Sequence, residues 1–283
     1  MNPEEMERLA AIVNAPSYRL AEEDPDFLQD DELRPVRMQL ELQKVEMALN
    51  RRQIHSTIVV FGGTVVVERQ TAQTQLDDAQ KTAAERPDDL AAARALARAE
   101  RILAKSHYYD EAREFCRLVS EKNKMEGHHE RIVVTGGGPG VMEAANRGAF
   151  DAGAKSAGLN ITLPREQVPN SYITPGLCFQ FHYFALRKMH FLMRAKALVV
   201  FPGGFGTLDE LFDALTLRQT HRMQSLPILL YGSEYWKRVI DFQFLADEGV
   251  IADSDLEYFQ FVDSPQEACK IITRYRLQPP VDF

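Results

Sequence analysis

The sequence predicts an α/β protein built on a doubly wound parallel sheet. Short apolar segments alternate with amphipathic helical segments along most of the chain, which is the order typical of parallel sheets with helical crossovers. Two of the apolar segments run directly into glycine-rich turns that a helical pattern follows at once. The first 50 residues show no strand pattern. We therefore expect an N-terminal helical extension over 1–50 and an α/β domain over 51–283.

The extension is expected to form helices at 4–14 and 36–51. The second of these has apolar residues at helical spacing on a charged background. Pro16, Pro25 and Pro35 interrupt the chain between the two helices, because proline removes a backbone donor and clashes with the preceding turn.

An insertion is expected at about 71–105. The first strand, 56–61, ends at Gly62-Gly63-Thr64, and a polar segment rich in Ala, Gln, Arg, Glu and Asp follows. Pro87 breaks this segment and Asp88-Asp89 provides a helix start, so we interpret it as a solvated helical hairpin.

The rest of the chain continues the alternation. Helices are expected at 108–124, 141–152, 184–196, 208–220, 235–248 and 265–274. Strands are expected at 131–135, 158–163, 178–183, 197–201, 227–231 and 258–262. His128-His129 falls in a polar link, and without acidic or cysteine partners at ligand spacing it favours a solvated loop over a metal site.

Composition excludes several classes of partner. The net charge of -8 argues against general binding to nucleic acid or to an anionic membrane, although it leaves room for a local basic pocket. No apolar run approaches the roughly 18 residues of a membrane span, and the N-terminus lacks a signal-peptide pattern. The three scattered cysteines, Cys116, Cys178 and Cys269, are typical of reduced thiols. We expect a cytoplasmic protein.

The turn at 202–207 is the strongest functional signal. The apolar strand 197–201 stops at Pro202, and three glycines follow that can bring the backbone close to a ligand: Gly203, Gly204 and Gly206. We expect Thr207 to be the N-cap of the next helix, with Glu210 in its first turn. Unpaired N–H groups and the positive end of the helix dipole would then favour a bound phosphate. An acidic residue there also simply suits the helix.

A second turn of this kind occurs earlier in the chain. The strand 131–135 leads into Gly136-Gly137-Gly138-Pro139-Gly140 and then into a helix. Two glycine turns on one sheet indicate a nucleotide cleft at the carboxyl edge of the strands. Neither turn fits the dinucleotide fingerprint or the P-loop pattern.

Charged residues fall at the same expected edge. Glu166 follows the strand 158–163 directly. Arg187-Lys188 lies near the start of the helix 184–196, where cations oppose the helix dipole, and a nearby anion would offset that cost. A solvated basic face is the simpler interpretation of these cations.

These motifs resemble the Lonely Guy (LOG) family of cytokinin-activating phosphoribohydrolases, long mislabelled as lysine decarboxylases. The segment 202–210 is similar to the family motif P-G-G-x-G-T-x-x-E. Gly136-Gly137-Gly138, Pro164-Arg165-Glu166 and Arg187-Lys188 match further blocks in the same order, so the likeness extends from about 56 to 274 without the insertion.

The resemblance implies a Rossmann-like fold, usually a homodimer, that hydrolyses the N-glycosidic bond of a nucleoside 5'-monophosphate such as AMP or a cytokinin riboside monophosphate. It implies Arg187 and Glu210 as the catalytic pair and requires no metal or other cofactor. The implied substrate contacts are Gly136, Gly137, Gly138, Glu166, Lys188, Gly203, Gly204, Phe205, Gly206, Thr207, Leu208, Asp209 and Thr216.

Some positions depart from the plant-type pattern. Ala185-Leu186 replaces the family's Met-His, and Glu143 stands where plant-type members have glycine. The extension and the insertion are further departures. Related bacterial members with extra segments act on AMP and other monophosphates, so the base preference stays open.

Three other functions remain as alternatives. A non-catalytic nucleotide or molybdenum-cofactor carrier uses the same fold and glycine loops, and the presence of both Arg187 and Glu210 favours the enzyme over it. A lysine decarboxylase needs a lysine Schiff base with pyridoxal phosphate, for which Lys188 and Lys196 are candidates only by chemistry. A purely structural role would leave four ligand-edge motifs without a purpose.

Overall fold

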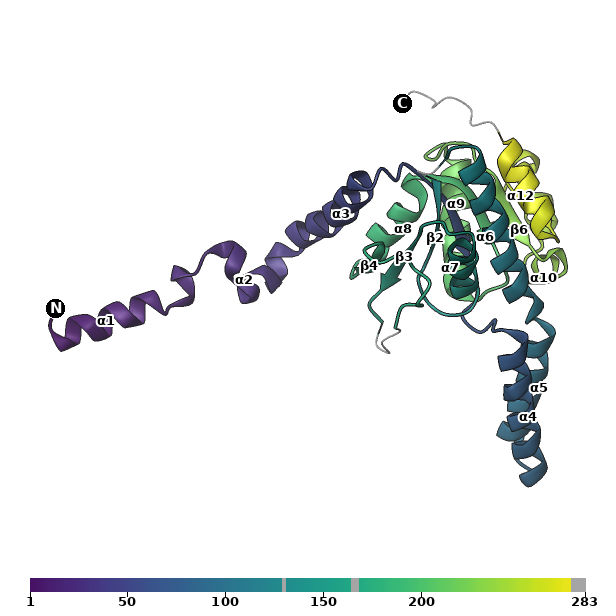
Figure 1. Ribbon diagram of the computed structural model, residues 1–283, viewed down its shortest axis with the longest axis horizontal. Coiled ribbons are helices and arrows are strands. Elements are labelled where there is room, and N and C mark those ends of the chain that lie inside the picture. The colour runs from purple at the N-terminus through teal and green to yellow at the C-terminus, as the bar shows by residue number, and fades with distance from the viewer. Residues whose placement is uncertain (129–130, 164–167, 276–283) are drawn as a thin grey trace. The chain divides into compact units, whose positions relative to one another are not determined.

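The computed structural model describes residues 1–128, 131–163 and 168–275. The chain divides into two compact units, Met1–Met47 and Ala48–Phe283, which are described separately here (Figure 1). Within the described residues, no helix is long and apolar enough to cross a bilayer.

The N-terminal unit is helical, as the sequence predicts. Its elements are α1 Pro3–Val13, three short 3-10 turns, α2 Pro25–Gln29 and the start of α3 Arg34–Arg51. The Asn2 side chain accepts a hydrogen bond from the Glu5 N–H, and the Glu5 carboxylate accepts one from the Asn2 N–H. This reciprocal capping box fixes the start of α1.

The second unit contains a fully parallel sheet of seven strands in the order β4-β3-β2-β1-β5-β6-β7. The strands are β1 Ser56–Phe61, β2 Arg131–Thr135, β3 Ser156–Ile161, β4 Cys178–Phe181, β5 Ala195–Val200, β6 Ile228–Tyr231 and β7 Gln260–Val262. Strand order reverses between β1 and β5. In sheets of this kind ligands bind at the carboxyl ends of the strands that flank such a switch point. The predicted doubly wound fold is therefore confirmed.

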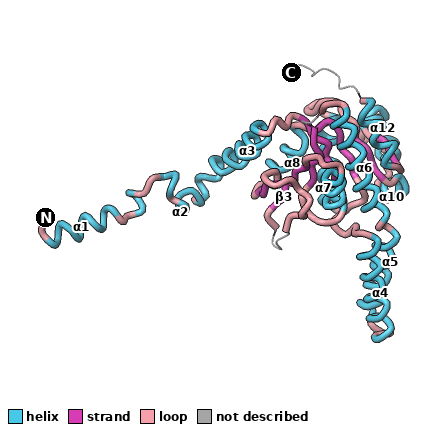
Figure 2. The backbone as a smooth tube through the Cα atoms, viewed as in Figure 1, coloured by secondary structure: helices cyan, strands magenta, loops and turns pink. Residues whose placement is uncertain are grey.

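Helices surround the sheet, as the cyan and magenta segments of Figure 2 show. They are α6 His107–Met125, α7 Val141–Asp151, α8 Phe184–Met193, α9 Phe205–Gln219, α10 Ser233–Val239, α11 Phe242–Asp247 and α12 Pro265–Arg274. Helix α6 packs against α7 and α12, and α8 packs against β3 and β4. The core cluster under α6 and α7 includes Val133, Phe115 and Val199.

The expected insertion is a hairpin of α4 Arg69–Glu85 and α5 Leu90–Ala104, which lie side by side (Figure 1). Small or apolar side chains are buried in it: Ala72 and Leu76 from α4, and Ala92 and Ala99 from α5. Asp89 caps α5 by accepting from the Ala91 N–H. An ion pair between Glu68 and Arg147 ties the root of the hairpin to α7.

Some predicted helices have different bounds, including the one expected at 208–220, which is α9 Phe205–Gln219. The helix expected at 184–196 ends at Met193, because Arg194 leaves helical geometry and Ala195 already pairs with Thr57 of β1. The helix expected at 235–248 is two helices, α10 and α11. Ile240 between them is extended, and Asp241 caps α11 by accepting from the Phe244 N–H.

Predicted strands also differ in their bounds: β4 ends at Phe181 rather than at 183, and β5 is Ala195–Val200 rather than 197–201. β3 begins two residues before the expected 158–163 and ends at Ile161. β7 is confined to Gln260–Val262, because the preceding residues form a 3-10 helix at Asp253–Tyr258.

Candidate active site

The glycine turn after β5 forms the start of α9, but not in the way the sequence predicts. The expected N-cap, Thr207, is wrong: the helix begins at Phe205, and the extended residue Gly204 is its N-cap. The Leu208 N–H donates to the Gly204 carbonyl at 3.0 Å, so the first helical turn begins three residues earlier than it would with Thr207 as the N-cap. Glu210 therefore lies in the second turn of α9 and not in its first.

The N-terminus of α9 is open. A Cβ atom built on Gly204 or on Gly206 would meet no atom within 4 Å, and the Phe205 side chain is 92% exposed. No side chain caps this helix end, and the first N–H groups of any α-helix lack acceptors within the helix. These free donors and the helix dipole make the turn suitable for an anion.

Neighbouring groups fix the direction of this turn. The Tyr235 hydroxyl donates to the Gly203 carbonyl at 2.6 Å, and the Gly63 N–H donates to the Pro202 carbonyl at 2.9 Å. In a planar trans peptide the N–H points away from the carbonyl oxygen. The bond from Tyr235 therefore turns the Gly204 N–H away from the Tyr235 side of the loop.

The structure brings Arg187 and Glu210 together, although they lie 23 residues apart in the sequence. Arg187 Nη1 lies 3.3 Å from Glu210 Oε1, and the two side chains are only 11% and 12% exposed. Arg187 Nε also donates to the Leu159 carbonyl at the end of β3, at 2.7 Å. The guanidinium lies over the Phe191 ring, 5.0 Å from its centroid. Several contacts thus fix its orientation.

Burial dominates the electrostatics of this pair. Removal from water raises the pKa of Glu210 to about 7, although the charge of Arg187 acts to lower it. Burial also lowers the pKa of Arg187, which the carboxylate partly offsets. Glu210 is therefore near its titration midpoint at neutral pH, which is the range a general base or acid needs.

The first glycine turn, after β2, forms part of the wall around Arg187. A Cβ on Gly136 would lie 2.5 Å from Arg187 Nη2, and one on Gly137 would collide with the Asn160 side chain. The glycines Gly136, Gly137 and Gly138 are all buried. The absence of side chains here gives the guanidinium its space.

Buried hydrogen bonds hold this first turn in place. The Gly137 N–H donates to the Thr135 hydroxyl, which donates to Asn146. The Asn170 amide donates to the carbonyls of Gly137 and Gly138. Hydrogen bonds within the protein therefore fix the backbone of this turn.

Other expected substrate contacts lie in different surroundings. Lys188 Nζ is 3.1 Å from Asp209 and 3.7 Å from Asp213, so carboxylates of α9 already engage it. Thr216 is exposed and lines a separate apolar groove with Phe212 and other residues, and the structure does not bring it to the Arg187–Glu210 pair. Glu166 lies outside the described residues.

Comparison with known proteins agrees with these motifs. Residues 142–272 match the family described as "Possible lysine decarboxylase". The cytokinin riboside 5'-monophosphate phosphoribohydrolase LOG3 of Arabidopsis thaliana is 25% identical over 174 residues, which cover 60% of this chain and 77% of the relative. The chain is thus similar to LOG proteins over these residues, in agreement with the resemblance of its motifs.

A second LOG relative matches a shorter stretch. It is a probable cytokinin riboside 5'-monophosphate phosphoribohydrolase, LOGL5, of Oryza sativa subsp. japonica, 29% identical over 114 residues, or 39% of this chain and 45% of the relative.

Among solved structures, the molybdenum cofactor carrier protein of Chlamydomonas reinhardtii is 17% identical, covering 77% of this chain and 96% of that chain with a TM-score of 0.45. The molybdenum cofactor binding protein of Rippkaea orientalis is 18% identical, covering 58% and 86%, with a TM-score of 0.40.

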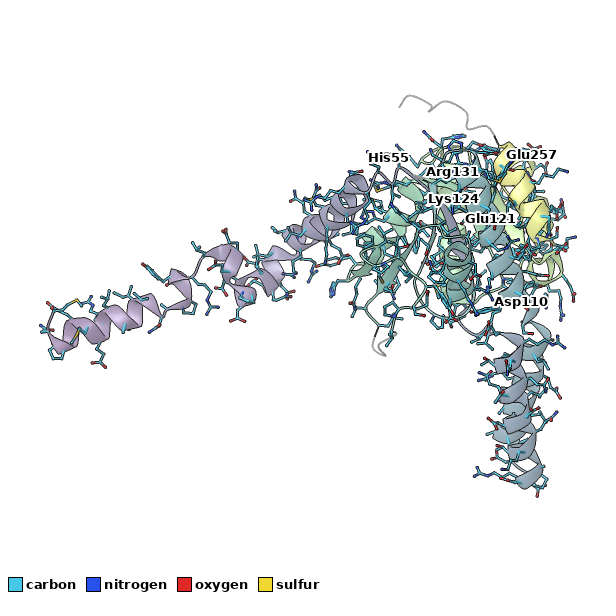
Figure 3. All side chains as sticks on the ribbon, in the orientation of Figure 1. His55, Asp110, Glu121, Lys124, Arg131 and Glu257 are labelled. Atoms are coloured by element: carbon cyan, nitrogen blue, oxygen red, sulfur yellow. The ribbon has the colours of Figure 1, made fainter. Side chains whose placement is uncertain are left out.

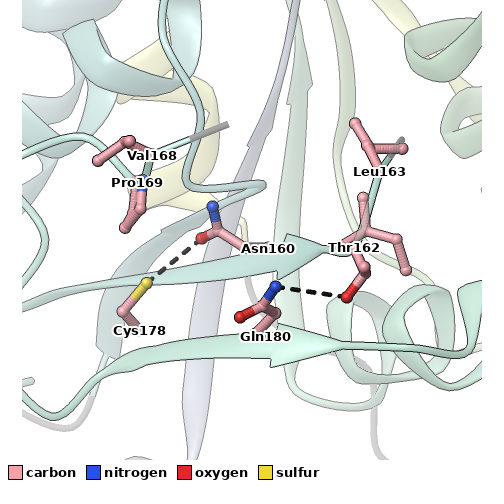
Figure 4. A pocket seen from close by; sticks show the side chains of 8 residues that line it. Asn160, Thr162, Leu163, Val168, Pro169, Cys178 and Gln180 are labelled. Carbon is pink, nitrogen blue, oxygen red and sulfur yellow. Dashed lines mark hydrogen bonds between the residues drawn. The ribbon is translucent and has the colours of Figure 1, made fainter. Parts of the chain in front are cut away.

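The second unit has a cavity of about 340 Å³ beside the end of β3 and along β4 (Figure 4). Asn160 accepts a hydrogen bond from the Cys178 thiol, and the Gln180 amide donates to the Thr162 hydroxyl, both at 3.3 Å. The same Asn160 side chain lies against Gly137 of the first glycine turn. The cavity therefore borders the site on the side of that turn.

Sequence reasoning missed the residues that support the site. Tyr235 and Asn170 donate hydrogen bonds to backbone carbonyls of the glycine turns, and Asn160 packs against Gly137. None of the three stands in a glycine motif. Leu159 contributes only its backbone carbonyl, for which a sequence carries no signal. One sequence pattern could have indicated Tyr235. It lies three residues after Gly232, the residue that follows β6, and β6 is the strand beside β5.

Proposed function

We propose that this protein hydrolyses the N-glycosidic bond of a nucleoside 5'-monophosphate, releasing the free base and ribose 5-phosphate. The observation that carries the proposal is the buried Arg187–Glu210 pair on α8 and α9, whose carboxylate lies in the helix that opens at Gly204 and Gly206. AMP or a cytokinin riboside monophosphate is the proposed substrate. The names of the LOG relatives support this reaction class.

The open end of α9 would hold the 5'-phosphate. The N–H groups near Phe205, Gly206 and Thr207 lie at the positive end of the helix dipole, where a phosphate is stabilised without a metal ion. Anchoring the phosphate also restrains the sugar. Restraint of this kind lowers the entropic part of the barrier for the attacking water.

Glu210 would stabilise the transition state. Cleavage of an N-glycosidic bond builds positive charge on the anomeric carbon and the ring oxygen, and a buried carboxylate interacts strongly with such charge. With a pKa of about 7, Glu210 can also accept a proton from the water that adds to the anomeric carbon. The departing base takes up a proton from the surroundings.

Arg187 would position this carboxylate and contact the substrate. Its Nε is held by the Leu159 carbonyl and its Nη1 reaches Glu210, so the remaining donors of the planar guanidinium can face a ribose hydroxyl. Of the other expected contacts, Lys188 and Asp209 form an ion pair at the rim, where we propose that they border the phosphate.

The test is a panel of nucleoside 5'-monophosphates incubated with the full-length protein, with base and ribose 5-phosphate quantified by chromatography. The proposal expects equal amounts of both products from at least one purine monophosphate. The corresponding nucleosides, which lack the phosphate, serve as controls and should be cleaved at least about 100-fold more slowly, because the phosphate anchor supplies several kcal/mol of binding. Tight binding of every monophosphate without any base release would contradict it.

A nucleotide or molybdenum-cofactor carrier is the second candidate. The open glycine turn would serve a carrier equally well, since it needs only the anion contacts. The buried carboxylate with a raised pKa favours the hydrolase, because a carrier gains nothing from a costly desolvated acid. Turnover in the panel above separates the two.

A decarboxylase is less well supported. Lys188 is engaged by Asp209 and Asp213, whereas a Schiff-base lysine must be available to react with the cofactor. We further propose a cytoplasmic homodimer. The cysteines of the described residues are free thiols, as a reducing compartment requires.

A further inference from the structure

A second polar cavity lies at the amino ends of the strands, opposite the glycine turns. It has a volume of about 220 Å³ and is bordered by the end of α6, the start of β2 and the loop between α7 and β3. Its lining residues in the described chain are Ser120, Asn123, Lys124, His128, Arg131, Ile132, Gly153, Ala154 and Lys155. Because β2 and β3 begin here, the cavity is separated from the glycine turns by the length of the strands.

The described lining contains lysine, arginine and histidine but no carboxylate. Three described acidic residues on or next to α6 and α7 have other partners. Glu121 pairs with Arg117 at 2.7 Å. Glu126 pairs with Lys122 at 3.1 Å, and Asp151 pairs with Arg113 at 2.5 Å. In a protein with a net charge of -8, it is unusual that Lys124, Arg131 and Lys155 share one cavity without a carboxylate partner among the described residues.

Helix carbonyls account for only one of these cations. Lys124 Nζ donates to the Ala152 carbonyl at 2.8 Å, which is the ordinary role of a lysine at a helix C-terminus. Arg131 Nη1 reaches Asn123 only at 3.5 Å, and Arg131 Nε is buried without a hydrogen-bond partner among the described residues. Lys155 is exposed on the rim. Figure 3 labels Lys124 and Arg131 on this side of the domain.

An unsatisfied buried guanidinium nitrogen is costly unless an acceptor is supplied from outside. Asn123 and Ser120, buried at 3% and 4% exposure, provide further polar groups at the floor of the cavity. We propose that this cavity binds the phosphate group of a small phosphorylated molecule or inorganic phosphate itself. Arg131 and Lys155 are its principal contacts, and Lys124 adds its remaining donors.

The size of the cavity limits the ligand. Pockets for drug-sized molecules span about 300–1,000 Å³, and a cavity of about 220 Å³ is smaller than that range. A volume of this size suits a phosphate, alone or with a short organic group, better than a whole nucleotide. The site is independent of the proposed phosphoribohydrolase reaction, because it shares no residue with the turn at 203–206.

The test measures phosphate binding to a variant in which the glycine-turn site is blocked. Gly206→Asp places a carboxylate in open space at the start of α9 and removes anion binding there without a steric clash. In this full-length background, inorganic phosphate and ribose 5-phosphate are titrated by calorimetry at constant ionic strength. Adding Arg131→Gln or Lys155→Gln is expected to raise the Kd for phosphate at least about fivefold each.

Lys81→Gln is the matched control, because Lys81 is an exposed lysine on α4 and its loss changes the net charge equally. It should leave the Kd unchanged. Lys155→Gln alters only a rim residue, so it tests the site even if Arg131→Gln fails to fold. The proposal is overturned if the Gly206→Asp protein binds neither phosphate compound, or if the Lys155→Gln and Lys81→Gln variants bind phosphate alike.

Discussion

The two glycine turns look alike in sequence but differ in what occupies the space that a side chain would fill. In the turn after β2, a Cβ on Gly136 or Gly137 would collide with Arg187 or with Asn160. In the turn after β5, a Cβ on Gly204 or Gly206 would meet nothing within 4 Å. Packing therefore explains the glycines of the first turn. The open glycines of the second turn need another explanation, and we propose that binding of the substrate phosphate supplies it.

Gly206→Asp tests the open turn, and we expect it to have the largest effect on activity. The new carboxylate would occupy and repel the phosphate position, which should lower kcat/KM for AMP at least about 100-fold. Folding should be retained, since the site has room and an acidic residue suits the first turn of α9. Steady-state kinetics and a thermal melt measure both. Full activity would show that the phosphate binds elsewhere.

Gly137→Ala tests the closed turn. Gly137 has a φ of 77°, which strains any residue with a Cβ, and the added methyl group would meet Asn160. We expect a loss of about 2 kcal/mol or more in the free energy of unfolding. Gly206→Ala is the control in urea denaturation, and it should cost less than about 0.5 kcal/mol because its site is open. Equal losses would remove the distinction between the turns.

The pH dependence tests the raised pKa of Glu210. If the carboxylate is the active form, kcat at saturating AMP should be constant above about pH 7 and fall about tenfold per pH unit below it. Measuring kcat rather than kcat/KM keeps the ionisation of the substrate phosphate out of the profile. A decline that begins near pH 4.5 would show that burial does not perturb Glu210, and a rate that falls as the pH rises would make it an acid.

Tyr235→Phe should have the smallest effect. It removes the hydrogen bond to the Gly203 carbonyl, worth about 1 kcal/mol, and so loosens the direction of the Gly204 N–H. KM for AMP should rise about fivefold with kcat nearly unchanged. Tyr275→Phe is the control, because it removes a hydroxyl that donates to Ser225 instead. If KM is the same in both variants, Tyr235 does not position the turn.

The sequence was sufficient for the fold because the buried parallel strands are continuous apolar runs. β1 and β5 are buried along nearly their whole length, and their predicted positions agree with the structure to within two residues. Errors arose at helix ends. The cap of α9 is a glycine without a side chain, and the break at Ile240 depends on a backbone conformation rather than on a proline or glycine.

The site was predictable only in part. The glycine turns were visible as local patterns, whereas the pairing of Arg187 with Glu210 was implied by the family resemblance and not by any spacing. That pairing depends on α8 and α9 meeting at the carboxyl edge, with the Leu159 carbonyl holding the guanidinium. Hydrogen bonds that use backbone atoms place little requirement on the residue type, so they cannot be predicted from the sequence.

The most direct test of the account is base release from AMP by Glu210→Gln beside Asp209→Asn. Both changes remove one negative charge from neighbouring positions of α9, but only Glu210 is buried against Arg187. We expect kcat to fall at least about 100-fold in Glu210→Gln, equivalent to about 2.7 kcal/mol of transition-state stabilisation, and less than about tenfold in Asp209→Asn. Near-normal release of adenine by a folded Glu210→Gln protein would contradict the central role given to this carboxylate.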